Sequence, residues 1–257
     1  MSRLWPEHLV VGIAAPTAWL RRGAQLTTYA VEGTPPLEPM ARIVAIFEAV
    51  LDTAAEIGRR GRVSLYLADP LAPVVDLPWQ PHLRRPAEWR VYAEGRFEAI
   101  GLPVLPDWTL AADYRHGGRC GVAYAMPTTL LTALAAAATA RGYALVEVLP
   151  AVVAAYFRHR PSRDGASLVV IEAPNHVAGL AYDRCGAVGM DIEPKAGAMP
   201  AWERALDRAQ SRVTGVRRIS HWVVGPLGDD AAEMARVQRL WPGVRYQRRA
   251  LSDWRAP

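Results

Sequence analysis

The chain has 257 residues, of which 51% are hydrophobic and 21% are charged, and its net charge is +5 at pH 7. This composition is that of a folded globular protein and excludes a disordered or fibrous chain. Lys195 is the only lysine, so the positive charge comes from arginines, which are scattered in pairs rather than gathered into a basic run. We therefore expect no nucleic-acid partner.

Cysteine content and hydropathy indicate the compartment. Cys120 and Cys185 are too few for a disulfide framework or a metal site, and a reducing cytoplasm is the simplest setting. The N-terminal segment MSRLWPEHLVV does not have the pattern of a signal peptide. The longest apolar helical stretch, 128–139, is too short to span a bilayer. The sequence predicts a cytoplasmic protein with no metal and no direct membrane insertion.

The first 68 residues predict three strands, a helix and a fourth strand. Short strands are expected at 9–15, 18–22 and 25–31, joined by tight connections. Apolar residues at helical spacing predict a helix over 39–57, and a strand follows at 62–68. The order is β-β-β-α-β.

The stretch 69–107 is rich in proline and predicts a small inserted lobe with one weak helix over 87–99. Tryptophan and arginine are enriched at protein interfaces. We therefore name Trp79, Trp89, Arg84 and Arg85 as candidate residues for docking a partner protein.

Regular patterns return at Trp108 and then repeat the opening order. The expected elements are strands at 109–114, 119–125 and 145–149, helices at 126–141 and 150–159, strands at 167–172, 177–183 and 187–192, a helix at 200–213, a strand at 218–224, a helix at 229–240 and a strand at 244–247. Both Leu9–Gly23 and Leu168–Gly186 begin with Leu-Val-Val and reach an Ala-Pro. The chain therefore predicts an α/β fold with two βββαβα halves, 1–160 and 161–257.

The segment from Trp108 onward resembles PilM-type type IV pilus assembly proteins and the cytoplasmic domain of GspL-type type II secretion proteins. The resemblance rests on Ala125-Met126-Pro127, on Gly142 to Leu145, on Pro150 and on the hairpin from Leu168 to Gly186. It implies an actin-like ATPase fold made of two ribonuclease-H-like halves. It also implies the partners: a segment of an inner-membrane platform protein, an assembly ATPase, or a second copy of the chain. The protein would then be cytoplasmic and peripheral to the inner membrane through these partners.

Actin-like ATPases carry an acidic residue and a glycine-containing turn in the first hairpin of each half, because backbone N–H groups and a carboxylate must hold the phosphates and magnesium. The first turn here, with Ala15, Pro16 and Thr17, has neither the acid nor the glycine. Pro16 also has no N–H to donate. We interpret this turn as a degenerate phosphate loop.

The second turn keeps an acid, Glu172, but has Pro174 where a donor is needed, followed by Asn175. Glu172 is either a displaced ligand of magnesium-bound water or, as we favour, a strand-end carboxylate on the solvent side. Thr17 and Asn175 are expected to shape their turns through local hydrogen bonds between side chain and backbone.

Gly225 and Gly228 lie where the actin-like fold places its adenosine-side loop, and the following Asp229 and Asp230 also suit the start of a helix. Because both phosphate loops are degenerate, the sequence predicts a non-catalytic scaffold without a cofactor. The alternative is an actin-like ATPase or small-molecule kinase with divergent loops, which would use ATP and magnesium.

Overall fold

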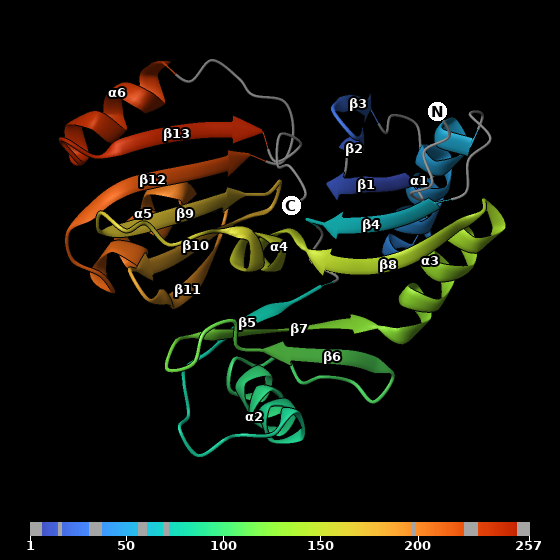
Figure 1. Ribbon diagram of the computed structural model, residues 1–257, viewed down its shortest axis with the longest axis horizontal. Coiled ribbons are helices and arrows are strands. Elements are labelled where there is room, and N and C mark those ends of the chain that lie inside the picture. The colour runs from blue at the N-terminus through green and yellow to red at the C-terminus, as the bar shows by residue number, and fades with distance from the viewer. Residues whose placement is uncertain are drawn as a thin grey trace.

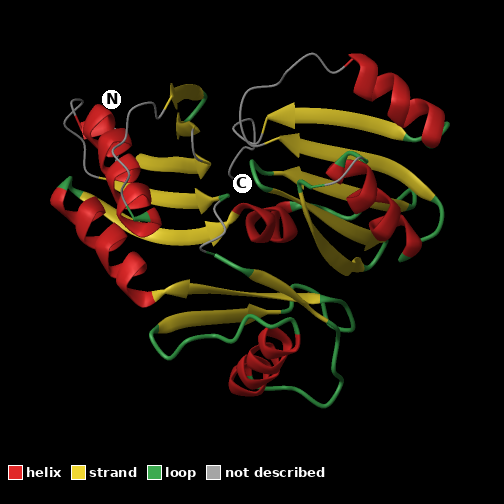
Figure 2. Cartoon of the chain, turned by 180° about the vertical axis from the view of Figure 1, so that it is seen from behind, coloured by secondary structure: helices red, strands yellow, loops and turns green. Residues whose placement is uncertain are grey.

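The computed structural model describes residues 7–14, 17–30, 38–55, 61–68, 72–196, 199–223 and 231–250. Two five-stranded sheets lie side by side with a helix, α4, between them, and a smaller sheet lies against the pair (Figure 1). The same three units are seen from behind in Figure 2.

The first half follows the expected order. Its elements are β1 (Glu7–Ala14), β2 (Thr17–Arg22), β3 (Gln25–Ala30), α1 (Pro39–Ala55), β4 (Gly61–Leu67), α3 (Thr128–Ala140), β8 (Tyr143–Pro150) and α4 (Ala151–Arg158). The strand order in the sheet is β3-β2-β1-β4-β8. The strands β1, β4 and β8 are parallel, and β2 runs antiparallel to both of its neighbours, β1 and β3.

The second half has the same order and the same topology. Its elements are β9 (Ala166–Glu172), β10 (His176–Asp183), β11 (Gly186–Pro194), α5 (Ala201–Ser211), β12 (Val216–Val223), α6 (Ala231–Leu240) and β13 (Arg245–Ala250). The sheet order β11-β10-β9-β12-β13 matches the first sheet strand for strand. The duplication predicted from the twin Leu-Val-Val stretches is therefore present in the fold.

The central strands are apolar on both faces because both faces are covered. In β9, Leu168 and Val170 pack in the core beneath α5 and α6, whereas Val169 and Ile171 belong to a different core. That second core also contains Val10 of β1, the helix α4 and other residues of both halves. Successive side chains of a strand point to opposite faces of the sheet. One face of each sheet therefore packs in that half's own core, and the other face packs in a core that the two halves share.

The inserted lobe is larger than the sequence indicated. It contains β5 (Val74–Leu77), α2 (Pro86–Ala99), β6 (Trp108–Asp113) and β7 (Gly121–Pro127), and its sheet order is β5-β7-β6. The weak helix was predicted, but β5 was not. The strands β6 and β7, expected as part of the first half's own order, belong to this separate sheet instead of the first.

The inserted lobe is attached to the second half by polar contacts. The Cys120 N–H donates to the Ala187 carbonyl at 3.0 Å, and Arg119 pairs with Asp183 at 2.7 Å. Cys120 is buried, and burial raises the pKa of its thiol to about 12, whereas Cys185 is exposed. These contacts hold the β6–β7 loop against the β10–β11 turn.

Gly95, on the surface of α2, is a position where a substitution can make the protein more stable. A Cβ added there has no neighbouring atom within 4 Å. Since glycine in a helix interior costs about 0.5–1 kcal/mol relative to alanine, Gly95→Ala is expected to raise the free energy of unfolding by that amount. Urea denaturation followed by circular dichroism measures the change, and a less stable variant would contradict the placement of Gly95 on an open helix face.

Candidate functional site

The first of the two predicted phosphate-loop turns joins β1 to β2. The Thr17 hydroxyl donates to the Ala14 carbonyl at 3.0 Å, which confirms the predicted local hydrogen bond. Ala15 and Pro16 lie outside the described residues, so their prediction is not tested.

The second turn joins β9 to β10 and is tied to the segment after β11. The Ala173 N–H donates to the His176 carbonyl at 2.9 Å, and the Asn175 carbonyl accepts from the Lys195 N–H at 3.0 Å. Pro174 lies between them and offers no donor. Asn175 therefore connects this turn to Lys195 through its main chain.

Glu172, at the end of β9, is bound by two cationic or donor groups of the protein itself. Lys195 Nζ lies 2.8 Å from Glu172 Oε1, and His221 Nε2 lies 3.0 Å from Glu172 Oε2. The Glu172 side chain is only 19% exposed. Glu172 is thus a strand-end carboxylate, as expected, but it is mostly buried. Both carboxylate oxygens are engaged, and the chain's only lysine is one of the partners.

The charge state of Glu172 follows from these contacts. Burial alone would raise the pKa of the carboxyl group, but the hydrogen bonds from His221 and Lys195 outweigh burial and lower the pKa to about 2. Glu172 is thus an anion throughout the physiological pH range. A magnesium ion at Glu172 would have to displace Lys195 or His221.

His221 continues the network into the core of the second half. Its ring is 1% exposed, and Nδ1 lies 2.7 Å from the Tyr246 hydroxyl. Because an ionised carboxylate can only accept, we place a proton on His221 Nε2, and the Tyr246 hydroxyl can then donate to Nδ1 of a neutral ring. The residues Glu172, His221 and Tyr246 form a chain of hydrogen bonds across β9, β12 and β13.

The direction of the Glu172 side chain is set by strand alternation. Glu172 shares the face of β9 that carries Leu168 and Val170, which pack in the core of the second half. Ile171 and Ala173 point to the opposite face, into the core shared with the first half. The carboxylate therefore points toward α5 and away from the first half.

A cavity of about 400 Å³ lies beside this network, at the start of α5. It is lined by Glu172, Val177, Lys195, Ala196, Met199, Pro200, Ala201 and Trp202. Within the described ranges, no three His, Cys, Asp or Glu side chains are arranged to hold a metal ion.

Sequence reasoning singled out Glu172 but not Lys195, His221 or Tyr246. Two signals were available: Lys195 is the only lysine, and His221 shares a strand face with the apolar Ile219 and Val223. The pairing itself follows only from the sheet order, since β12 lies between β9 and β13.

The remaining predicted residues are those of the adenosine-side loop and the candidates for docking a partner. Gly225 and Gly228 lie outside the described residues, so the adenosine-side loop is not tested. Trp79 and Trp89 both pack edge-on against Tyr114, with ring centroids 5.2 and 5.3 Å away. Both tryptophans thus pack within the inserted lobe. Trp89 Nε1 also donates to the Leu83 carbonyl at 3.2 Å.

Arg84 and Arg85 precede α2, and their guanidinium groups are exposed. Their backbone N–H groups donate to Glu88 Oε2 at 2.7 and 3.0 Å, which satisfies donors at the start of the helix. Both residues are exposed at the surface of the inserted lobe.

In the part of the chain that the structure describes, no helix combines the length and hydropathy needed to cross a membrane.

Comparison with known proteins defines the class of fold. No protein-family model and no curated protein matches this sequence. Solved structures do match: the chain has the actin-like ATPase fold, with two α/β halves and a small antiparallel sheet inserted in the first. The likeness covers nearly the whole chain at low sequence identity.

Three solved structures illustrate the likeness. A Bacteroides thetaiotaomicron protein of unknown function with an actin-like ATPase fold is 9% identical, with a TM-score of 0.58 and coverage of 94% of this chain and 91% of the other. The PilM–PilN type IV pilus biogenesis complex gives 13% identity, a TM-score of 0.59 and coverage of 95% and 88%. The third is the cytoplasmic domain of EpsL, an inner membrane component of the type II secretion system of Vibrio cholerae. It gives 13% identity, a TM-score of 0.51 and coverage of 96% of this chain and 91% of the other.

Proposed function

We propose that this protein is a non-catalytic scaffold that binds partner proteins in the inner-membrane platform of a type IV pilus or a type II secretion system. The observation that carries the proposal is the state of Glu172. Its two oxygens are held by Lys195 and His221, and its side chain points toward α5. Lys195 and His221 thus occupy the acid that an actin-like ATPase would use for magnesium.

The fold relatives support the choice of machine. PilM is found in a complex with PilN, and EpsL is an inner membrane component of a secretion system. By analogy, the partners of this chain would be a segment of an inner-membrane platform protein, an assembly ATPase or a second copy of the chain. The protein would be cytoplasmic and held at the inner membrane by these partners.

The alternative is an actin-like ATPase or small-molecule kinase with divergent phosphate loops. It requires ATP and magnesium to bind near the two turns and the enzyme to turn over. The two proposals make opposite predictions about nucleotide.

The scaffold proposal predicts no saturable binding of ATP in the presence of magnesium, because Lys195 already balances the charge of Glu172 and His221 occupies its other oxygen. Isothermal titration calorimetry on the full chain, with and without magnesium, measures this directly. A Lys195→Met variant serves as the comparison: if Lys195 is what blocks the acid, only this variant could gain weak magnesium binding. Saturable, magnesium-dependent ATP binding by the wild-type chain, or ATP hydrolysis, would overturn the non-catalytic part of the proposal.

A second experiment tests whether the candidate docking residues bind a partner protein. The chain is mixed with the cytoplasmic segment of the platform membrane subunit from its own host, and binding is followed by fluorescence anisotropy. Arg84→Glu combined with Arg85→Glu is compared with Arg90→Glu, which lies on the same lobe in an exposed pair with Glu94. Binding that is lost only in the double variant supports docking at Arg84 and Arg85, and no binding of any platform segment or assembly ATPase contradicts the scaffold function.

A further inference from the structure

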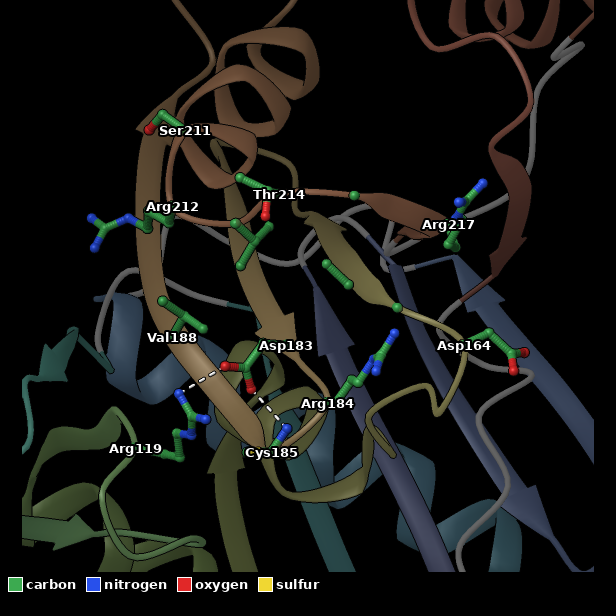
Figure 3. Close-up of a pocket in the computed structure, with 14 residues that line it drawn as sticks. Arg119, Asp164, Asp183, Arg184, Cys185, Val188, Ser211, Arg212, Thr214 and Arg217 are labelled. Carbon is green, nitrogen blue, oxygen red and sulfur yellow. Dashed lines mark hydrogen bonds and ion pairs between the residues drawn. The ribbon is translucent and has the colours of Figure 1, made fainter.

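A cavity with a basic lining lies at the other end of the second sheet from Glu172. Its volume is about 680 Å³ (Figure 3). The β6–β7 loop, the start of β9, the β10–β11 turn and the α5–β12 connection all contribute to it. Since Glu172 ends β9 and Ala166 begins it, this cavity is separate from the network at Glu172.

The lining carries a surplus of positive charge. It contains four arginines and two aspartates, a difference of two charges: Arg119, Arg184, Arg212, Arg217, Asp164 and Asp183. Arg119 pairs with Asp183 at 2.7 Å, and Arg212 pairs with Asp191 at 2.7 Å. Within the described residues, Arg184 and Arg217 form no ion pair, and both are exposed to solvent.

Glycines hold three of the arginine side chains in place. A Cβ added to Gly165 would lie 2.8 Å from Arg217 Cγ. A Cβ at Gly186 would lie 3.1 Å from Arg119 Cγ, and a Cβ at Gly189 would lie 2.8 Å from Arg212 Cδ. Such distances are far shorter than an ordinary van der Waals contact, so each arginine stem runs flat across a glycine.

This packing has a consequence for binding. An arginine whose stem rests on the backbone loses less conformational freedom when its guanidinium group meets a ligand. Arg217 is therefore both unpaired within the described residues and pre-positioned. In Figure 3, Arg184, Asp164 and Arg217 all lie to the right of Asp183.

The opposite wall is less suited to an anion. The helix α5 ends there at Ser211, and the carboxyl end of a helix carries partial negative charge. Arg212, next to that end, is already bound to Asp191. An anion would consequently be held by Arg184 and Arg217 rather than by the α5 wall.

We propose that this cavity binds a phosphorylated small molecule, with Arg184 and Arg217 as the ligands of its phosphate group. A phosphate monoester carries about −1.5 to −2 charge at pH 7, and the two guanidinium groups of Arg184 and Arg217 carry the positive charge that balances it. Guanidinium groups bind phosphate oxygens in a bidentate manner. The volume lies within the roughly 300–1,000 Å³ of small-molecule sites, so it also has room for the group that carries the phosphate.

The test is calorimetric titration of the full chain at low salt with three probes: inorganic phosphate, glycerol 2-phosphate and acetate. We expect saturable binding of both phosphates, weaker binding of acetate, and loss of affinity as sodium chloride is added. Arg184→Gln combined with Arg217→Gln is expected to weaken phosphate binding at least about tenfold, because charged hydrogen bonds contribute about 1.5–3 kcal/mol each. The matched control, Arg90→Gln, removes an arginine of the exposed surface of α2 and should bind as the wild type does.

A second readout uses the exposed thiol of Cys185 on the cavity lining, since Cys120 is buried. Bound glycerol 2-phosphate should slow the reaction of Cys185 with a thiol reagent in the wild type and in the Arg90→Gln control, but not in the double variant. Inorganic phosphate that binds while glycerol 2-phosphate does not would overturn the proposal of a larger phosphorylated ligand. Equal phosphate affinity in wild type and double variant, or binding of an acidic hexapeptide with no binding of either phosphate, would also overturn it. The outcome is independent of the scaffold function, which concerns other residues.

Discussion

Replacing Gly12 with alanine is expected to lower the free energy of unfolding by about 3 kcal/mol or more. Gly12 of β1 faces Trp19 of β2 directly in the strand register, and a Cβ at Gly12 would overlap the indole ring. The ring and the new methyl group cannot occupy the same volume. Urea denaturation followed by tryptophan fluorescence and circular dichroism measures the loss.

The cost is high because Trp19 is buried and packed against other core residues. Its side chain is 4% exposed, its ring lies 6.4 Å from that of Tyr66, and both rings belong to the core that joins the two halves. Expelling a buried tryptophan costs about as much as deleting it, in the range of 3–5 kcal/mol. The same displacement would loosen the contact between the halves.

A double-mutant cycle separates this clash from other effects of the substitution. Trp19→Ala alone should be strongly destabilising, but Gly12→Ala added to it should cost less than about 0.5 kcal/mol, since the overlapping ring is gone. Gly95→Ala, with open space around its Cβ, is the matched control for the glycine-to-alanine change. If the losses at Gly12 and Trp19 simply add, the close approach of the two residues does not limit stability.

The fold was predictable from local patterns wherever those patterns repeat. Strand and helix periodicities gave the element order of both halves, and the twin stretches at Leu9 and Leu168 indicated the duplication. The strand β5 was missed because it spans only Val74–Leu77 and is flanked by Pro73 and Pro78, which are typical of a loop. Its pairing with β7 is a long-range contact that no local pattern records.

The candidate site was predictable only in part. Glu172 could be identified because it ends a strand at the position of a phosphate loop, and Thr17 because its hydroxyl bonds to a neighbour three residues away. The partners Lys195, His221 and Tyr246 come from three other strands or their ends, so their contact with Glu172 depends on the sheet order. The direction of Glu172 toward α5 depends on strand register, which sequence spacing leaves open by one residue.

Glu172→Gln is expected to lower the free energy of unfolding at pH 7 by about 3 kcal/mol, because it leaves a buried imidazole and an ammonium group without their anion. The variant keeps the size of the side chain, so the loss reports charge rather than packing. Glu94→Gln is the control: Glu94 forms an exposed pair with Arg90, and exposed pairs contribute at most about 1 kcal/mol. Equal effects at Glu172 and Glu94 would show that the network at Glu172 is not stabilising.

The difference in the free energy of unfolding between wild type and Glu172→Gln should shrink as the pH falls into the acid range. The pKa of Glu172 is about 2 in the folded protein and 4.5 in the unfolded chain. A lowered folded pKa stabilises the protein above the unfolded pKa, so the difference should be complete above about pH 4.5 and should shrink as the pH falls toward about 2. The slope in that window is about 1.4 kcal/mol per pH unit for one proton. Urea denaturation of both proteins between pH 7 and pH 3 measures it, and a difference that stays constant down to pH 3 would mean that ionised Glu172 is not the group that stabilises the fold.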